Sequence, residues 1–146
     1  MSTLRTLARI ALGTAMTGAG ITHLTVARQE FRAQVPDWFP VDADAVVLVS
    51  GVAEVALGAS FVALPKHRRT VGALLAAFFV VIFPGNVAQY VEHTDAFGLD
   101  TDTKRFVRLF FQPVLVLWAL WAGGLLSRRR PVVAEEQRRE EVDTGE

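Results

Sequence analysis

The sequence predicts an all-α polytopic membrane protein, folded as a bundle of four transmembrane helices. Its totals, 51% hydrophobic and 21% charged residues, fit a globular domain as well as a membrane domain. The distribution of charge decides between the two, because four long segments are nearly free of it. Each is about long enough to cross a hydrocarbon core of roughly 30 Å. We expect one transmembrane domain, residues 1–127, with spans at residues 4–27, 43–64, 70–91 and 103–126.

The first span, residues 4–27, is an apolar run that follows two arginines, as a secretory signal peptide does. A signal peptide is the less favoured interpretation, because the interior is rich in Gly and Thr and no small-x-small cleavage site follows. Gly13 with Thr17, and Thr14 with Gly18, form faces of small residues. Such faces favour close packing against a neighbouring helix.

The second span, residues 43–64, carries a single carboxylate near its middle, Glu54, one turn after Ser50. A charge roughly 14 Å inside the bilayer costs a few kcal/mol, so Glu54 is expected to face inward and to have a partner. The preceding linker contains Pro36 and Pro40, which forbid a continuous helix. Its aromatic residues are typical of the headgroup region, and an aspartate at 42 or 44 is expected to cap the span.

Pro84 and Gly85 predict a kink or break in the last third of the third span, residues 70–91, where Asn86 and Gln89 also occur. Irregular backbone at this depth is tolerated where it lines a cavity enclosed by protein. The fourth span, residues 103–126, is expected to start after Asp100 or Thr101. Arg108 and Gln112 lie one turn apart on this span.

Basic residues predict the topology. Eight Lys and Arg side chains flank the span ends on the side of the termini, against five on the other side. This excess favours both termini in the cytoplasm of a bacterial cell, with the protein in the inner membrane. Residues 128–146 begin with three arginines and contain little apolar surface, so we expect a disordered, charged, cytoplasmic tail.

In this topology each helix supplies polar side chains to the outer half of the bundle. His23 is placed roughly 5 Å and Glu54 roughly 14 Å below the outer boundary, with Asn86 and Gln112 between them at roughly 8 Å. The pattern predicts a ligand pocket, in which Glu54 exchanges protons with His23 or with a headgroup such as that of a quinone. The candidate ligand-binding residues are His23, Ser50, Glu54, Asn86, Gln89, Arg108 and Gln112. The alternative is that these groups serve helix packing, with Arg108 snorkelling to the interface.

Several classes of site are disfavoured. The chain has no cysteine, so it supplies no disulfide, thiolate metal site or Cys-x-x-Cys relay. Its formal net charge of zero gives no indication of the basic surface that nucleic-acid binding requires. A haem or metal held by His23 and His93 lacks any binding motif, so no metal is expected. No phosphate-binding loop or nucleophile elbow is present, and no catalytic residue can be assigned.

Six segments carry a resemblance to a known family: GAGITHL at 18–24, QVPDWFP at 34–40, SGVAEVALG at 50–58, LPKHRR at 64–69, FPGNVAQY at 83–90 and RLFFQPVLVLWALW at 108–121. Over residues 4–126 the chain resembles DoxX-like membrane proteins. The resemblance implies a four-helix bundle of bacterial and archaeal membranes that is associated with quinone-linked redox or oxidative-stress systems. The positions that match the family are His23, Glu54, Asn86 and Gln112.

Three functions follow as hypotheses. The first is a small subunit or accessory protein of a quinone-linked redox or oxidative-stress complex, with a quinone as ligand. The second is a membrane assembly or scaffold protein without catalysis. The third, transport of a small solute, is weaker because four helices enclose little room unless the chain forms a homo-oligomer. Whether the protein is an enzyme stays open; an enzymatic role would be that of an oxidoreductase subunit.

Overall fold

The computed structural model describes residues 2–127 and confirms the all-α prediction. Its elements are α1 (Thr3–Leu24), the short α2 (Arg28–Arg32), α3 (Ala43–Ala63), a 3₁₀ turn η1 (Pro65–His67), α4 (Arg68–Val91) and α5 (Asp102–Gly123). Within residues 2–127 there is no strand. The tail predicted to be disordered, residues 128–146, lies outside the described residues.

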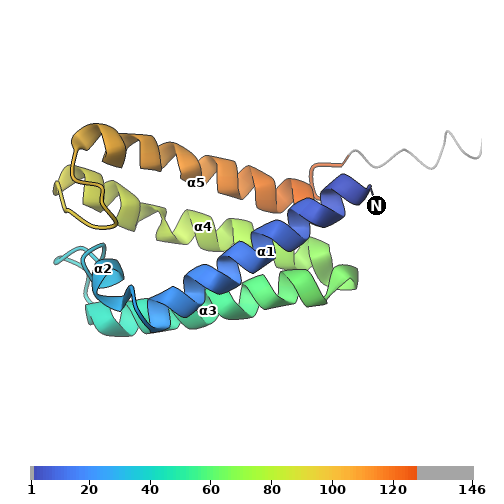
Figure 1. The fold of residues 1–146 in the computed structure, drawn as a ribbon, viewed down its shortest axis with the longest axis horizontal. Helices are drawn as coiled ribbons and strands as arrows, with labels where there is room; N and C mark the ends of the chain where they lie inside the picture. Colours follow the sequence, from blue (N-terminus) through green and yellow to red (C-terminus); the bar gives the residue numbers. More distant parts are fainter. Residues whose placement is uncertain (1, 128–146) are drawn as a thin grey trace, which may run out of the picture.

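The four long helices form two antiparallel pairs, α1 with α3 and α4 with α5 (Figure 1). The pairs approach each other most closely at the end where the chain starts, because α1 crosses over toward α5 there. We call this the terminal end; it also holds η1. The opposite end holds α2 and the connecting residues 33–42 and 92–101, and we call it the loop end.

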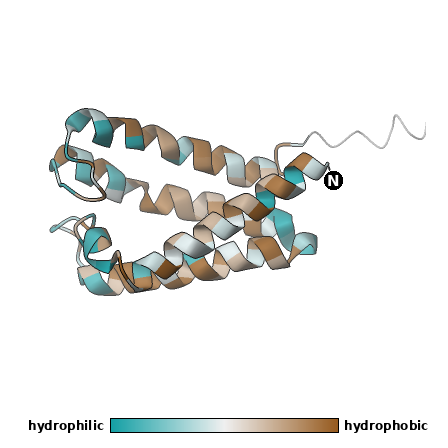
Figure 2. Cartoon of the chain, in the orientation of Figure 1, coloured by the Kyte–Doolittle hydropathy of each residue, from teal (hydrophilic) through white to brown (hydrophobic). Residues whose placement is uncertain are grey.

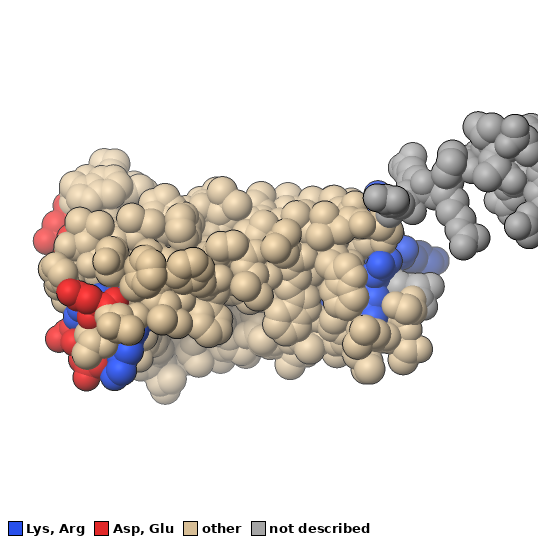
Figure 3. Space-filling view, turned by 90° about the horizontal axis from the view of Figure 1, so that it is seen from above, with Lys and Arg blue, Asp and Glu red and all other residues tan. Residues whose placement is uncertain are grey.

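Three helical stretches are long and apolar enough to cross a membrane, namely Ala43–Ala63, Pro65–Val91 and Asp102–Gly123. Apolar residues dominate these helices, and in the face seen in Figure 3 the charged side chains gather at the two ends (Figures 2 and 3). The chain is therefore a membrane protein in a bilayer environment. The prediction of a fourth span is not confirmed, because α1 is not among these helices. Its Gly and Thr residues and two arginines lower its hydropathy.

Helix ends follow the local chemistry. Asp42 caps α3 by accepting the backbone N–H of Ala45, and Thr101 caps α5 in the same way. α5 ends at Gly123, earlier than predicted, because Gly124 adopts a left-handed φ of 87°. Of the kink or break predicted at Pro84, the break does not occur, since α4 continues as one helix to Val91.

The interior changes character along the bundle. All four long helices contribute to an apolar core toward the terminal end: Leu12, Met16, Phe61, Val71, Leu75, Ala76, Phe79, Ala119 and Ala122. Toward the loop end the buried side chains are mainly polar: His23, Glu54, Asn86, Gln89, Arg105 and Gln112. The core therefore fixes the helices at one end and leaves a polar interior at the other.

Glycines hold α1 against α3. A Cβ added to Gly20 would lie 2.7 Å from the carbonyl oxygen of Gly51, and one added to Gly58 would lie 2.6 Å from that of Gly13. The two backbones touch without intervening side chains, as in small-residue contacts between membrane helices. The face that includes Gly18 does not take part, because a Cβ there would meet no atom within 4 Å.

Candidate functional site

A histidine and a glutamate meet in the polar interior between α1 and α3. Nδ1 of His23 lies 2.9 Å from Oε2 of Glu54, and both side chains are more than nine-tenths buried. The same nitrogen lies 3.0 Å from the carbonyl oxygen of Ala19, one turn earlier in α1. A single N–H on Nδ1 cannot donate to both the Ala19 carbonyl oxygen and the Glu54 carboxylate. Within residues 2–127, Glu54 Oε2 has no hydrogen-bond partner with acceptable angles. The pair therefore holds one carboxylate oxygen that is buried and unsatisfied.

His23 lies nearer to Glu54 along the bundle than predicted, because its side chain contacts the Glu54 carboxylate and its Cβ packs against Gly51, three residues before Glu54. α1 ends at Leu24, before its predicted end, and the His23 Cβ sits 2.8 Å from the place where a Cβ on Gly51 would be. The first turns of α3 therefore continue past the end of α1. The connection that contains α2 folds back beside them, and His23 becomes an interior residue instead of an interfacial one.

Two aromatic rings cover the pair on the side of the loop end. The Phe31 ring of α2 stacks on the His23 imidazole, with centroids 3.1 Å apart and planes inclined by 18°. The Phe97 ring lies 4.5 Å beyond it. Phe97 has a left-handed φ of 55°, and its backbone N–H donates to Oε2 of Glu30, 2.7 Å away. This contact ties α2 to the loop after α4, and the rings separate the pair from the loop end.

A second polar pair lies between α4 and α5. Asn86 Nδ2 donates to Gln112 Oε1 at 3.0 Å, and Gln112 Nε2 donates to the carbonyl oxygen of Phe79 at 2.6 Å. Phe79 lies one residue before Val80, whose carbonyl oxygen has no helical donor because Pro84 lacks an N–H. The amide pair therefore ties α4 to α5 just before the proline, and α4 continues as one helix to Val91.

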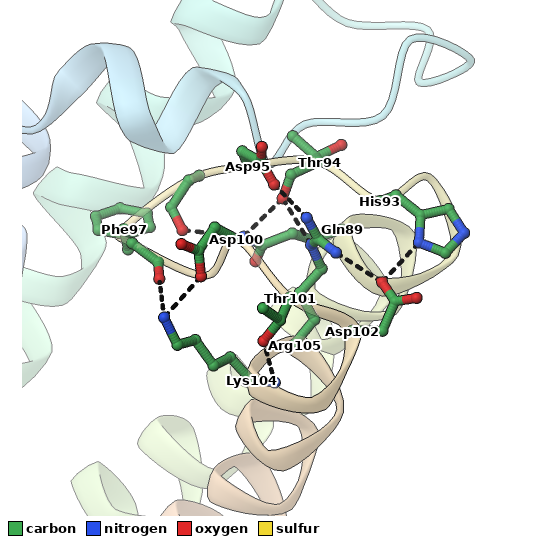
Figure 4. A network of polar contacts seen from close by, with 12 residues as sticks. Gln89, His93, Thr94, Asp95, Phe97, Asp100, Thr101, Asp102, Lys104 and Arg105 are labelled. Carbon is green, nitrogen blue, oxygen red and sulfur yellow. Dashed lines mark hydrogen bonds and ion pairs between the residues drawn. The ribbon is translucent and has the colours of Figure 1, made fainter.

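Gln89 and Arg105 organise the connection between α4 and α5 (Figure 4). Gln89 Nε2 lies 3.4 Å from the carbonyl oxygens of both Thr94 and Ala96, and its Oε1 accepts from Gln34 of the first connection. The buried Arg105 pairs with Asp95 and Asp102 and donates to the carbonyl oxygen of Thr94 at 3.2 Å.

A surface ion pair borders this network. Lys104 Nζ lies 2.6 Å from Oδ1 of Asp100, and this hydrogen bond holds the pKa of the Asp100 carboxyl below its usual value. Both side chains are more than half exposed, so solvent screens the interaction and its contribution to stability is small.

The predicted site residues form separate groups instead of one converging set. Within residues 2–127 no hydrogen bond or ion pair joins the His23–Glu54 pair to the Asn86–Gln112 pair. The Ser50 hydroxyl donates to the carbonyl oxygen of Val47 in its own helix. The remaining two, Gln89 and Arg108, lie in the loop network and on the α5 surface. The physical reason is that the helices pack as two pairs, with the His23–Glu54 contact inside one pair and the Asn86–Gln112 hydrogen bond inside the other.

Sequence reasoning missed Arg9, which it used only for topology. This buried side chain donates to the carbonyl oxygens of Phe61 and Val62, at the C-terminal end of α3 where a cation is favourable. The signal was available, because Arg9 falls at helical spacing with Leu12 and Met16 on the buried stripe of α1.

A family model described as "Domain of unknown function (DUF8561)" matches residues 12–123. No curated protein and no solved structure is detectably similar to the chain. The match begins within α1 and ends with α5, so it spans the helical bundle.

This finding overturns the assignment to DoxX-like proteins, because the matching family is a different one. Four of the six segments behind that resemblance, at 18–24, 50–58, 83–90 and 108–121, consist mainly of small and apolar residues around isolated polar ones. Such segments recur wherever helices pack closely in lipid, so they indicate an environment more strongly than an ancestry.

Proposed function

Because this chain belongs to the DUF8561 family of domains of unknown function, we propose its function from the geometry of its polar interior. The protein binds a lipophilic molecule with a hydrogen-bonding headgroup, namely a quinone, at the His23–Glu54 pair. The observation that carries the proposal is the buried Oε2 atom of Glu54, which has no hydrogen-bond partner within the described residues. In the same proposal the protein acts as a small subunit or accessory protein of a quinone-linked redox or oxidative-stress system.

The residues present fit such a headgroup. A bound quinone supplies reversible electron and proton chemistry, and this chain supplies two groups that hold a proton. A protonated Glu54 can donate to an oxygen of the headgroup or to Nδ1 of His23, and a protonated His23 can return that proton across 2.9 Å. In this dry interior an unpaired charge is costly, which favours transfer within the pair over loss to lipid.

Entry to the site requires α2 to move. The Phe31 ring lies nearly parallel to the His23 imidazole, in the place that a flat headgroup would take. α2 has only five residues and none of them is buried, so its displacement has to break mainly the Phe31 ring contacts, the Glu30–Phe97 hydrogen bond and the Arg28–Asp44 ion pair. We propose that Phe31 swings away with α2 and that the headgroup then stacks on the imidazole.

Binding of a short-chain ubiquinone analogue to the purified protein in mild detergent tests the site. We expect saturable binding by isothermal titration calorimetry. Glu54→Gln and His23→Ala should each weaken it by about tenfold or more, since a hydrogen bond to a charged group is worth about 1.5–3 kcal/mol. Ser50→Ala is the matched control one turn away, and its affinity should equal that of the native protein because the Ser50 hydroxyl bonds within its own helix. Affinity unchanged by both site substitutions rejects the proposal.

A scaffold without a ligand is the second candidate function. It is favoured by the Asn86–Gln112 pair, which joins α4 to α5 by direct hydrogen bonds and needs no third group. The calorimetric experiment separates the candidates when Glu54→Leu is added. A scaffold should bind no quinone, and its stability should be unchanged or raised by Glu54→Leu, because a well-packed apolar side chain often replaces a buried polar one without loss.

We also propose that α1 crosses the bilayer as a fourth span, with the loop end outside a bacterial inner membrane and both termini in the cytoplasm. The support is the glycine contact that keeps α1 alongside α3, and the excess of basic residues that flank the span ends on the side of the termini in the sequence. The absence of cysteine allows a direct test with single-cysteine variants. In intact cells a membrane-impermeant maleimide should label Asp37→Cys and leave Lys66→Cys unlabelled until the cells are opened. The reverse pattern, or labelling of both, contradicts this topology.

A further inference from the structure

One basic side chain at the loop end lacks an acidic partner. Five basic residues lie there: Arg28, Arg32, Lys104, Arg105 and Arg108. Within residues 2–127 each of the first four has a carboxylate oxygen within 4.0 Å. Arg108 has none; its Nε is buried without a hydrogen-bond partner, and its guanidinium carbon lies 5.8 Å from the centroid of the Phe97 ring. A guanidinium one or two turns inside a membrane helix without a counter-ion calls for an anion from outside the chain.

The surface beside Arg108 is shaped for an elongated apolar molecule. An open groove of about 360 Å³ is lined by Leu99, Thr103, Lys104, Val107, Arg108 and Phe111. Lys104 lies toward the loop end and Phe111 lies two turns deeper on α5, about 10 Å along the axis, with Val107 and Arg108 between them. Val107 and Phe111 are at least half exposed, on a helix apolar enough to face lipid.

We infer that this groove binds an anionic phospholipid, with the phosphate on Arg108, whose charge no carboxylate within residues 2–127 offsets, and one acyl chain along Val107 and Phe111. Lys104 and Arg108 lie on the loop-end side of Phe111, as the headgroup of a lipid lies at the membrane boundary with the hydrocarbon below it. Charge complementarity favours a lipid with a net negative charge, because a choline ammonium would lie beside Lys104. The site is distinct from the His23–Glu54 pair and does not depend on the proposed quinone binding.

Native mass spectrometry of the full chain in mild detergent, with phosphatidylglycerol added, tests the inference. The native protein should retain phosphatidylglycerol about tenfold more tightly than phosphatidylcholine, and inorganic phosphate alone should not bind. Arg108→Gln should lower the apparent affinity for phosphatidylglycerol by about tenfold. Arg32→Gln is the matched control: it removes the same charge at the same end of the bundle but away from the groove, and it should change the affinity less than twofold.

A second variant leaves Arg108 in place. Val107→Trp fills the groove from an exposed position, so it should lower retention of phosphatidylglycerol while leaving the helix content by circular dichroism unchanged. Equal retention by the native protein, Arg108→Gln and Val107→Trp overturns the inference. Equal losses in Arg108→Gln and Arg32→Gln also overturn it, because they indicate attraction by general surface charge. Equal retention of phosphatidylcholine overturns the preference for an anionic lipid.

Discussion

Replacing Gly20 with alanine is expected to destabilise the bundle by about 2 kcal/mol or more, within the range typical of overpacking a close contact. The new Cβ would lie 2.7 Å from the carbonyl oxygen of Gly51 and 2.8 Å from the backbone nitrogen of Val55. Both are backbone atoms of α3, so no side-chain rotation relieves the overlap and the helices must move apart. The measurement is unfolding in mixed detergent micelles with increasing dodecyl sulfate, followed by circular dichroism.

Gly18→Ala is the matched control for this experiment. It lies two residues earlier in the same helix, and its Cβ would meet no atom within 4 Å. Since alanine favours the helix over glycine by up to about 1 kcal/mol, this variant should be as stable as the native protein or more stable. Equal destabilisation by the two substitutions would show that α1 does not pack on α3 through the Gly20 face.

Arg105→Met is expected to loosen the connection between α4 and α5. The substitution keeps most of the buried volume but removes the ion pairs to Asp95 and Asp102 and leaves the carbonyl oxygen of Thr94 without its Arg105 donor. Because both carboxylates are more than half exposed, we discount their share and expect a total loss of about 2 kcal/mol in local stability. Amide hydrogens of residues 93–101 should then exchange roughly 30-fold faster.

Lys104→Met provides the comparison, since it removes a neighbouring cation whose ion pair with Asp100 is exposed. Exchange in residues 93–101 should change less than about threefold, as expected for a surface ion pair that solvent screens. If Arg105→Met also left exchange unchanged, Gln89 and the contact of Phe97 with Glu30 would be sufficient to order the connection.

The helices and the direction of buried polar residues could be predicted from the sequence, because hydropathy and charge placement act locally along the chain. Glu54 was expected to face inward and to have a partner, and it lies buried against His23. The cap at Asp42 also follows from local chemistry. Arg9 lies at helical spacing from Leu12 and Met16, so its burial was also predictable, although the charge of Arg9 is equally typical of a residue that sets topology.

The grouping of the polar residues could not be predicted, because it depends on which helices pair. The predicted depths placed Asn86 and Gln112 near His23. Depth gives the position along the membrane normal only, and does not say which helices are neighbours in the membrane plane. In the structure the glycine contact joins α1 to α3, and the amide pair joins α4 to α5. The stacking of Phe31 on His23 could not be predicted from the sequence either, because it requires the connection after α1 to fold back beside α3.

The glycine contact between α1 and α3 has a consequence for biosynthesis. The hydropathy of α1 is too low for it to count as a membrane span by itself, whereas the hydropathy of α3 is high enough. While the ribosome is still synthesising α3, the glycines of α1 have no α3 backbone to pack on, and the threonines and arginines of α1 favour water. With α1 as the proposed fourth span, we therefore expect the two helices to leave the translocon together as a closed hairpin, with α3 as the anchor that retains α1. A nascent chain that stops before Ala43 would then slip back out of the bilayer.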